Sequence, residues 1–156
     1  MTTWQHRDTS RARHYALTDG PETVAECRAV TRQALREWFG QAGAAGCTAV
    51  EDAVLLVSEV VGNACRHADG PYELSLDHTD RRLRAQVSDA SPARPRPSGP
   101  HRPARSSGHG LYLLDRLAAA WGCLPRPRGK AVWFEIDIPP EDPGHTPVRT
   151  PPGEVP

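Results

Sequence analysis

The segment Val50–His67, which reads VEDAVLLVSEVVGNACRH, carries the strongest helix pattern in the chain. Its apolar residues recur every three or four positions and fall on one side of a helix: Val50, Val54, Val57, Val61 and Ala64. An apolar stripe of this kind has to be covered by a second layer of structure. The segment is therefore expected to lie against the core of a folded domain.

A set of polar side chains, spaced four residues apart, follows the other side of this predicted helix. Glu59, Asn63 and His67 lie there one turn above another. Glu59 has apolar neighbours, and a partly desolvated carboxylate is a candidate general base. The side-chain oxygen of Asn63 is a candidate ligand for Mg²⁺, which needs only one or two protein oxygens beside phosphates and water. Taken alone, the helix favours a simpler interpretation, in which these residues join Asp52 and Arg66 on a solvated face.

Outward from this helix, the hydrophobic patterns predict two more helices and four strands. The helices are expected at Pro21–Phe39 and Gly110–Ala120, and the strands at Tyr72–His78, Arg82–Asp89, Trp121–Leu124 and Ala131–Ile138. A turn is expected at Gly40–Gly46 and a long loop at Ala90–Ser107. This order predicts an α+β two-layer sandwich, with the helices on one face of a mixed, mostly antiparallel sheet.

The length of 156 residues suits one domain with one core, which we expect at residues 14–138. Residues 1–13 are polar and are interpreted as a flexible N-terminus. Residues 139–156 contain seven prolines and little to bury, which is typical of a disordered tail.

Charge, hydropathy and cysteine spacing exclude several classes of protein. The chain has 19 basic and 19 acidic residues, so its net charge gives no electrostatic reason for direct binding to nucleic acid. No apolar stretch is long enough to span a bilayer or to form the core of a signal peptide, which predicts a cytoplasmic protein without membrane contact. The four cysteines form no CxxC pair, which argues against a zinc site and a disulfide framework.

Asp89 is a candidate ligand-binding carboxylate at the end of a predicted strand. It continues the alternation of Leu83, Ala85 and Val87, so it is expected on the core face. An ionised carboxylate in that position needs a partner, and the amino group of an adenine would serve as one. An equally good interpretation is a turn-initiating aspartate in the corner Asp-Ala-Ser-Pro.

The loop that follows Asp89 is basic and ends in a glycine pair at a predicted helix start. No acidic residue occurs between Asp89 and Asp115, whereas four arginines and two histidines do: Arg94, Arg96, Arg102, Arg105, His101 and His109. Gly108 and Gly110 would let backbone amides approach a ligand, and a helix N-terminus favours an anion. The pattern indicates a lid for a polyphosphate, although a disordered basic loop would have the same composition.

Four motifs in this order resemble those of the Bergerat-type ATPase family, which includes sensor histidine kinases and gyrase B subunits. The resemblance covers about residues 14–138 and is closest to the anti-sigma-factor serine/threonine kinases and their short actinobacterial relatives. The motifs are SEVVGNACRHA at 58–68, similar to the N box, VSDASP at 87–92 and GHGL at 108–111, similar to two glycine boxes, and GKAVWFE at 129–135, similar to the closing strand. The resemblance implies the histidine kinase-like ATPase fold.

The resemblance also implies roles for the residues at matching positions. Glu59 would be the catalytic general base, Asn63 the ligand of Mg²⁺, and Asp89 the acceptor for adenine. Backbone amides at four positions would line the phosphates of ATP: Gly108, His109, Gly110 and Leu111. His67 matches a frequent histidine of the N box, with no role implied here. Among the departures, His109 stands where relatives often carry arginine, and Ala131 where many carry a threonine that helps to bind adenine through water.

Two functions follow from this resemblance. In the first, the chain is an anti-sigma-factor-type kinase that uses ATP and Mg²⁺ to phosphorylate a serine or threonine on a small antagonist protein. In the second, it is a non-catalytic switch whose nucleotide controls binding to a sigma factor or another regulator. A homodimer is compatible with either. Binding to nucleic acid through the basic loop is the weakest alternative, because that loop has no aromatic residue.

Overall fold

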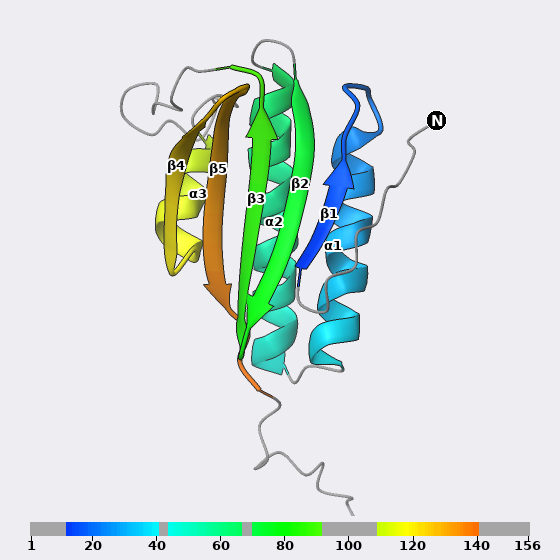
Figure 1. Cartoon of the computed structure of the whole chain (residues 1–156). Coiled ribbons are helices and arrows are strands. Elements are labelled where there is room, and N and C mark those ends of the chain that lie inside the picture. Colours follow the sequence, from blue (N-terminus) through cyan, green and yellow to red (C-terminus); the bar gives the residue numbers. More distant parts are fainter. Residues whose placement is uncertain (1–11, 41–43, 67–69, 92–108, 141–156) are drawn as a thin grey trace, which may run out of the picture.

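The computed structural model describes residues 12–40, 44–66, 70–91 and 109–140 (Figure 1). The described helices are α1 (Thr23–Phe39), α2 (Ala44–Arg66) and α3 (His109–Leu117). The described strands are β1 (Ala12–Ala16), β2 (Pro71–Thr79), β3 (Arg82–Asp89), β4 (Ala120–Arg126) and β5 (Gly129–Asp137).

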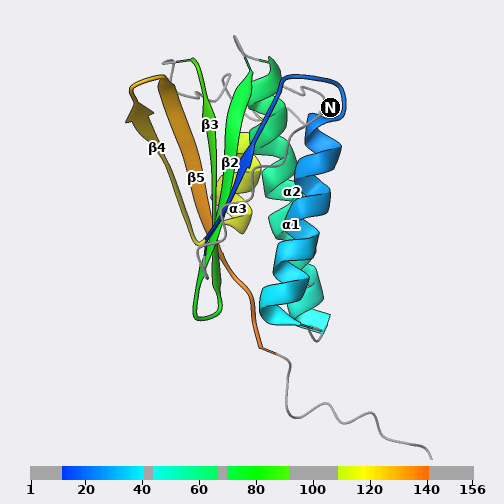
Figure 2. The same ribbon diagram turned by 45° about the vertical axis from the view of Figure 1, so that its right-hand side comes forward.

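The strands form one sheet in the order β1-β2-β3-β5-β4, and every pairing among them is antiparallel. Figures 1 and 2 show the three helices together on one face of this sheet. The predicted α+β sandwich is therefore confirmed. The sheet was expected to be mixed, but its described strands contain no parallel pair.

Strand β1 was not predicted from the sequence. It pairs with β2 along its whole length, so Ala12 and Arg13 belong to the sheet rather than to a flexible N-terminus. Only Tyr15 among its five residues is buried, and one buried side chain gives no alternation to recognise. The other residues of the expected flexible N-terminus lie outside the described part, as does the tail beyond Pro140.

Most predicted elements are present with shifted ends. Helix α2 begins at Ala44, earlier than the expected Val50. The prediction missed the first turn because this turn contains Gly46 and has no apolar stripe to mark it. Helix α3 ends at Leu117 instead of Ala120. Just beyond it, the Ala119 N–H donates to the Glu135 carbonyl of β5 at 2.8 Å, so the chain already follows the sheet there.

The core lies between the sheet and the helices. The predicted stripe of α2 faces this core: Val54, Val57, Val61 and Ala64 are buried, and Val50 is partly buried and packs against them. Cys27 of α1 is also completely buried, and burial raises the pKa of its thiol to about 12. That thiol is therefore protonated at neutral pH and packs as a small apolar side chain.

Candidate functional site

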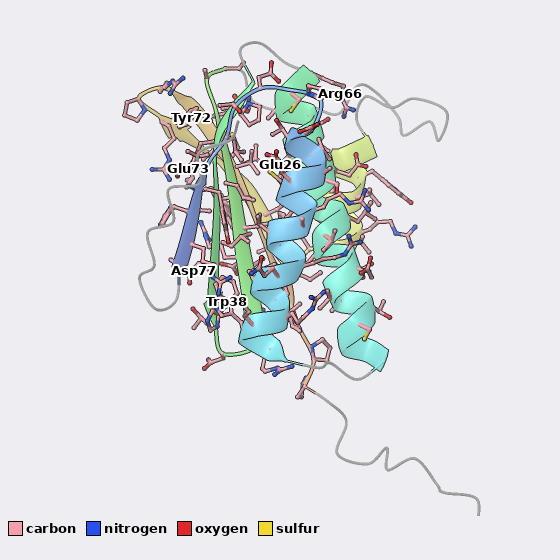
Figure 3. All side chains as sticks on the ribbon, turned by 90° about the vertical axis from the view of Figure 1, so that its right-hand side faces the viewer. Glu26, Trp38, Arg66, Tyr72, Glu73 and Asp77 are labelled. Carbon is pink, nitrogen blue, oxygen red and sulfur yellow. The ribbon has the colours of Figure 1, made fainter. Side chains whose placement is uncertain are left out.

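The elements that carry the predicted site residues meet at one end of the sandwich. The C-terminal end of α2, the end of β3 and the start of β5 lie together there (Figure 1). Helix α3 also points its N-terminus toward this end, because its C-terminal end is tied to Glu135 near the far end of β5. In Figure 3, Arg66 and Tyr72 mark this end, while Trp38 and Asp77 lie toward the other.

On α2, the candidate base and the candidate metal ligand are both half-buried. Glu59 precedes Asn63 by one turn, next to the buried pair Val60 and Val61. Within the described residues, no hydrogen bond engages the Glu59 carboxylate. The Asn63 Oδ1 accepts a hydrogen bond of 2.6 Å from Arg66 Nη2, one turn further along. On this side of α2, Asp52, Glu59 and Asn63 are each partly buried, whereas Arg66 is exposed.

Asp89 lies on the core face at the end of β3, as its alternation predicted, and it is almost completely buried. Its Oδ1 accepts the Ser91 backbone N–H at 2.9 Å, which makes the turn expected from the Asp-Ala-Ser-Pro corner. The same oxygen accepts a hydrogen bond from Lys130 Nζ at 3.0 Å. The carboxylate therefore finds its charged partner within the chain, so its burial alone does not require a ligand.

Lys130 is the residue that the sequence analysis missed. It lies opposite Asp89 in the pairing of β3 with β5, and its side chain is 8% exposed. Its Nζ also donates to the Ser91 carbonyl oxygen at 3.2 Å. The alternation of Val132, Phe134 and Ile136 would have found Lys130 if it had been extended by one step toward the turn.

Ala131 does not face the Asp89 carboxylate. Ala131 lies opposite Ser88, so it is on the other face of the sheet from Asp89. A threonine side chain at this position would point away from the Asp89 carboxylate. Lys130, which is directly opposite Asp89, lies on the same face as Asp89, because neighbouring residues of a strand point to opposite faces.

Gly129 makes the close approach of β5 to the end of β3 possible. Its φ is +124°, and a Cβ built on it would lie 2.1 Å from the Asp89 carbonyl oxygen and 2.6 Å from the Ala90 carbonyl carbon. Both atoms belong to the backbone and cannot move aside cheaply. Only glycine fits here, and the contact fixes where Lys130 meets Asp89.

A Gly129→Ala variant is expected to be destabilised by about 1–3 kcal/mol from backbone strain alone. Thermal unfolding measures the loss. Gly20→Ala is the matched control, since a Cβ at Gly20 would have Thr23 Oγ1, at 4.0 Å, as its nearest neighbour. The control should change stability by less than about 0.5 kcal/mol. Equal effects of the two substitutions would contradict the role given to Gly129.

The predicted phosphate-binding segment is described only in part. His109 and Gly110 form the first residues of α3, and Leu111 is buried beneath them at 5% exposure. Gly108, the basic loop at 92–107 and His67 lie outside the described residues. Helix α3 starts one residue earlier than predicted and directs its first backbone amides toward the end of the sandwich that carries Asp89.

A family model described as a histidine kinase-like ATPase domain matches residues 18–136. The chain belongs to this family. The match includes α1, α2, α3 and all strands except β1, up to the last residue but one of β5. None of the curated proteins compared with the chain matches it.

As a histidine kinase-like ATPase domain, the chain is an ATP-binding regulatory protein. Among the described residues of this ATPase domain, no helix is long and apolar enough to cross a membrane.

Magnesium fits the donor chemistry of this ATPase domain at Asn63. Its Oδ1 is a hard oxygen ligand and keeps a second lone pair beside the one that Arg66 engages. The described residues contain no cluster of three histidine, cysteine, aspartate or glutamate side chains that could hold a metal ion alone. An ion at Asn63 would therefore need phosphate oxygens and water as its other ligands, the usual arrangement for Mg²⁺ with a nucleotide.

Proposed function

We propose that this domain binds Mg-ATP at the end of the sandwich where α2, β3, β5 and α3 meet. Asp89 would accept the adenine amino group through Oδ2, because both of its hydrogen bonds to described residues use Oδ1. The phosphates would lie toward the first amides of α3, at His109, Gly110 and Leu111. The fourth amide that the resemblance implies, at Gly108, lies outside the described residues. Magnesium, held at Asn63, would neutralise part of the phosphate charge.

We further propose that the domain is a protein serine/threonine kinase of the anti-sigma-factor type. The observation that carries this proposal is the position of Glu59, half-buried and one turn before Asn63 on the same side of α2. Its carboxylate is not engaged by any described residue, so it is available to accept a proton. In the reaction, the bond from the γ-phosphorus to ADP breaks and a bond to the partner's hydroxyl oxygen forms, while the hydroxyl proton moves to Glu59.

The test is transfer of label from γ-labelled ATP to proteins that co-purify with the chain. We expect one small protein partner, an antagonist of an anti-sigma factor, to acquire phosphoserine or phosphothreonine. Mass spectrometry of the labelled band identifies the residue. If the chain binds Mg-ATP but labels none of its co-purified partners, the kinase proposal is wrong.

A non-catalytic switch is the second candidate, and the contact between Arg66 and Asn63 favours it. The guanidinium that donates to Asn63 Oδ1 places a positive charge beside the oxygen that a metal ion would use, and like charges repel each other. In a switch, nucleotide would change the affinity for a sigma factor or another regulator without chemical transfer. Binding to that partner would then depend on nucleotide but survive replacement of Glu59.

A further inference from the structure

The buried pair of Asp89 and Lys130 leaves hydrogen-bonding capacity on both partners. Lys130 Nζ has three N–H donors, and two of them go to Asp89 Oδ1 and the Ser91 carbonyl oxygen, at 3.0 and 3.2 Å. Asp89 uses only Oδ1 for its contacts with the described residues. One N–H of Lys130 and the Oδ2 oxygen of Asp89 therefore remain without a partner among those residues.

The pair is expected to stay intact when a ligand enters. The side chains are only 5% and 8% exposed, so separating them would leave two unpaired charges away from water. The amino group of a nucleobase is neutral and cannot replace an ammonium group as the partner of a buried carboxylate. A base that approaches Asp89 should therefore bind to the pair, through the oxygen and the N–H that remain.

Backbone geometry holds the pair in place independently of any ligand. Asp89 is clamped by its own turn through the Ser91 N–H, and Lys130 is clamped by the register of β5 against β3. Gly129 brings the two strands into contact directly beside the pair. Few side-chain rotations remain to be restricted on binding, which is the condition under which a hydrogen bond contributes most to affinity.

We propose that Lys130 is a base-recognition residue. It holds Asp89 in place through Oδ1 and donates its third N–H to a ring nitrogen of adenine. Asp89 Oδ2 accepts a hydrogen bond from the amino group of the same base. This rests on the proposed ATP site at Asp89. The amino group of adenine is a donor, and it has a ring-nitrogen acceptor next to it on each edge, N1 on one and N7 on the other. Either edge can therefore pair with the Asp89 Oδ2 acceptor and the Lys130 N–H donor.

The first measurement uses the wild-type chain, so it does not depend on how a variant folds. Calorimetry compares Mg-ATP with 1-deaza-ATP and 7-deaza-ATP, in which N1 or N7 is replaced by a C–H group. One of the two analogues should bind about tenfold to a hundredfold more weakly than ATP, the usual effect of losing a hydrogen bond to a charged group.

The second measurement compares Lys130→Met with Arg126→Met, which removes an exposed cation from the same hairpin. Lys130→Met should weaken ATP binding about tenfold to a hundredfold and abolish the difference between ATP and the sensitive analogue, whereas Arg126→Met should change neither. If both analogues bind the wild type as tightly as ATP does, the role of Lys130 is refuted while the proposed ATP site stands. If the wild type binds no ATP at all, the proposed function and the role of Lys130 fall together.

Discussion

A Glu59→Gln variant should bind Mg-ATP like the wild type and lose phosphoryl transfer by about 10²–10⁴-fold. The amide has nearly the shape of the carboxylate, and Asn63, one turn away on α2, is unchanged. Glutamine cannot accept the proton of the attacking hydroxyl group, so the loss should appear in the rate of transfer. Single-turnover transfer from labelled ATP to the co-purified partner measures that rate, and calorimetry measures the affinity for Mg-ATP.

Asn63→Ala is the matched comparison, because it changes the other polar residue on the same side of α2. It should weaken Mg²⁺-dependent ATP binding itself, whereas Glu59→Gln should not. The two variants thus separate an effect on rate from an effect on affinity. Transfer by Glu59→Gln at the wild-type rate would refute the role of general base. The non-catalytic switch would be supported by two results together: the wild type transfers no phosphate, and Glu59→Gln binds the partner protein as tightly as the wild type does.

The alternation of apolar residues predicted the position of Asp89 correctly but missed its partner. Leu83, Ala85 and Val87 put Asp89 on the core face, and that part is confirmed. The last predicted strand began at Ala131 and so left Lys130 out, since a lysine is rarely buried. A buried charge on one strand is itself a reason to look for an opposite charge at the matching position of a neighbouring strand.

Strand β1 was beyond the reach of a local pattern. Its five residues are held by backbone hydrogen bonds to β2, a segment more than fifty residues away in the chain. Backbone pairing is independent of side-chain identity, so it leaves little trace in composition. The order of the strands was also unpredictable in detail, because placing β5 between β3 and β4 depends on long-range packing.

Helix α2 was the most predictable element because its stripe is long and regular. Val57 and Val61 are completely buried, as expected, and Glu59 and Asn63 lie on another side of the same helix. The hydrogen bond from Arg66 to Asn63 was not foreseen. Arg66 had been grouped with the solvated residues, and helical spacing says which residues are neighbours but not which of their atoms bond.

Breaking the buried pair of Asp89 and Lys130 should strongly lower the free energy of unfolding. Removing one member leaves the other as an uncompensated buried charge, which costs about 3–5 kcal/mol. Asp89→Asn and Lys130→Met should each show a loss of this size. For a chain of this length, that corresponds to a decrease in melting temperature of about 6–20 °C. Scanning calorimetry of the chain without nucleotide measures the loss free of any contribution from ligand binding.

The double variant Asp89→Asn/Lys130→Met should be more stable than either single variant. With both charges gone, the asparagine side-chain oxygen can still accept the Ser91 N–H that now bonds to Asp89 Oδ1. Methionine keeps most of the volume of the lysine stem in a site where only 8% of the side chain is exposed. Replacing a buried ion pair by neutral groups of similar volume is often nearly neutral, whereas breaking it is not. If the two single losses simply add in the double variant, the charges do not depend on each other, and Lys130 does not hold Asp89 in place.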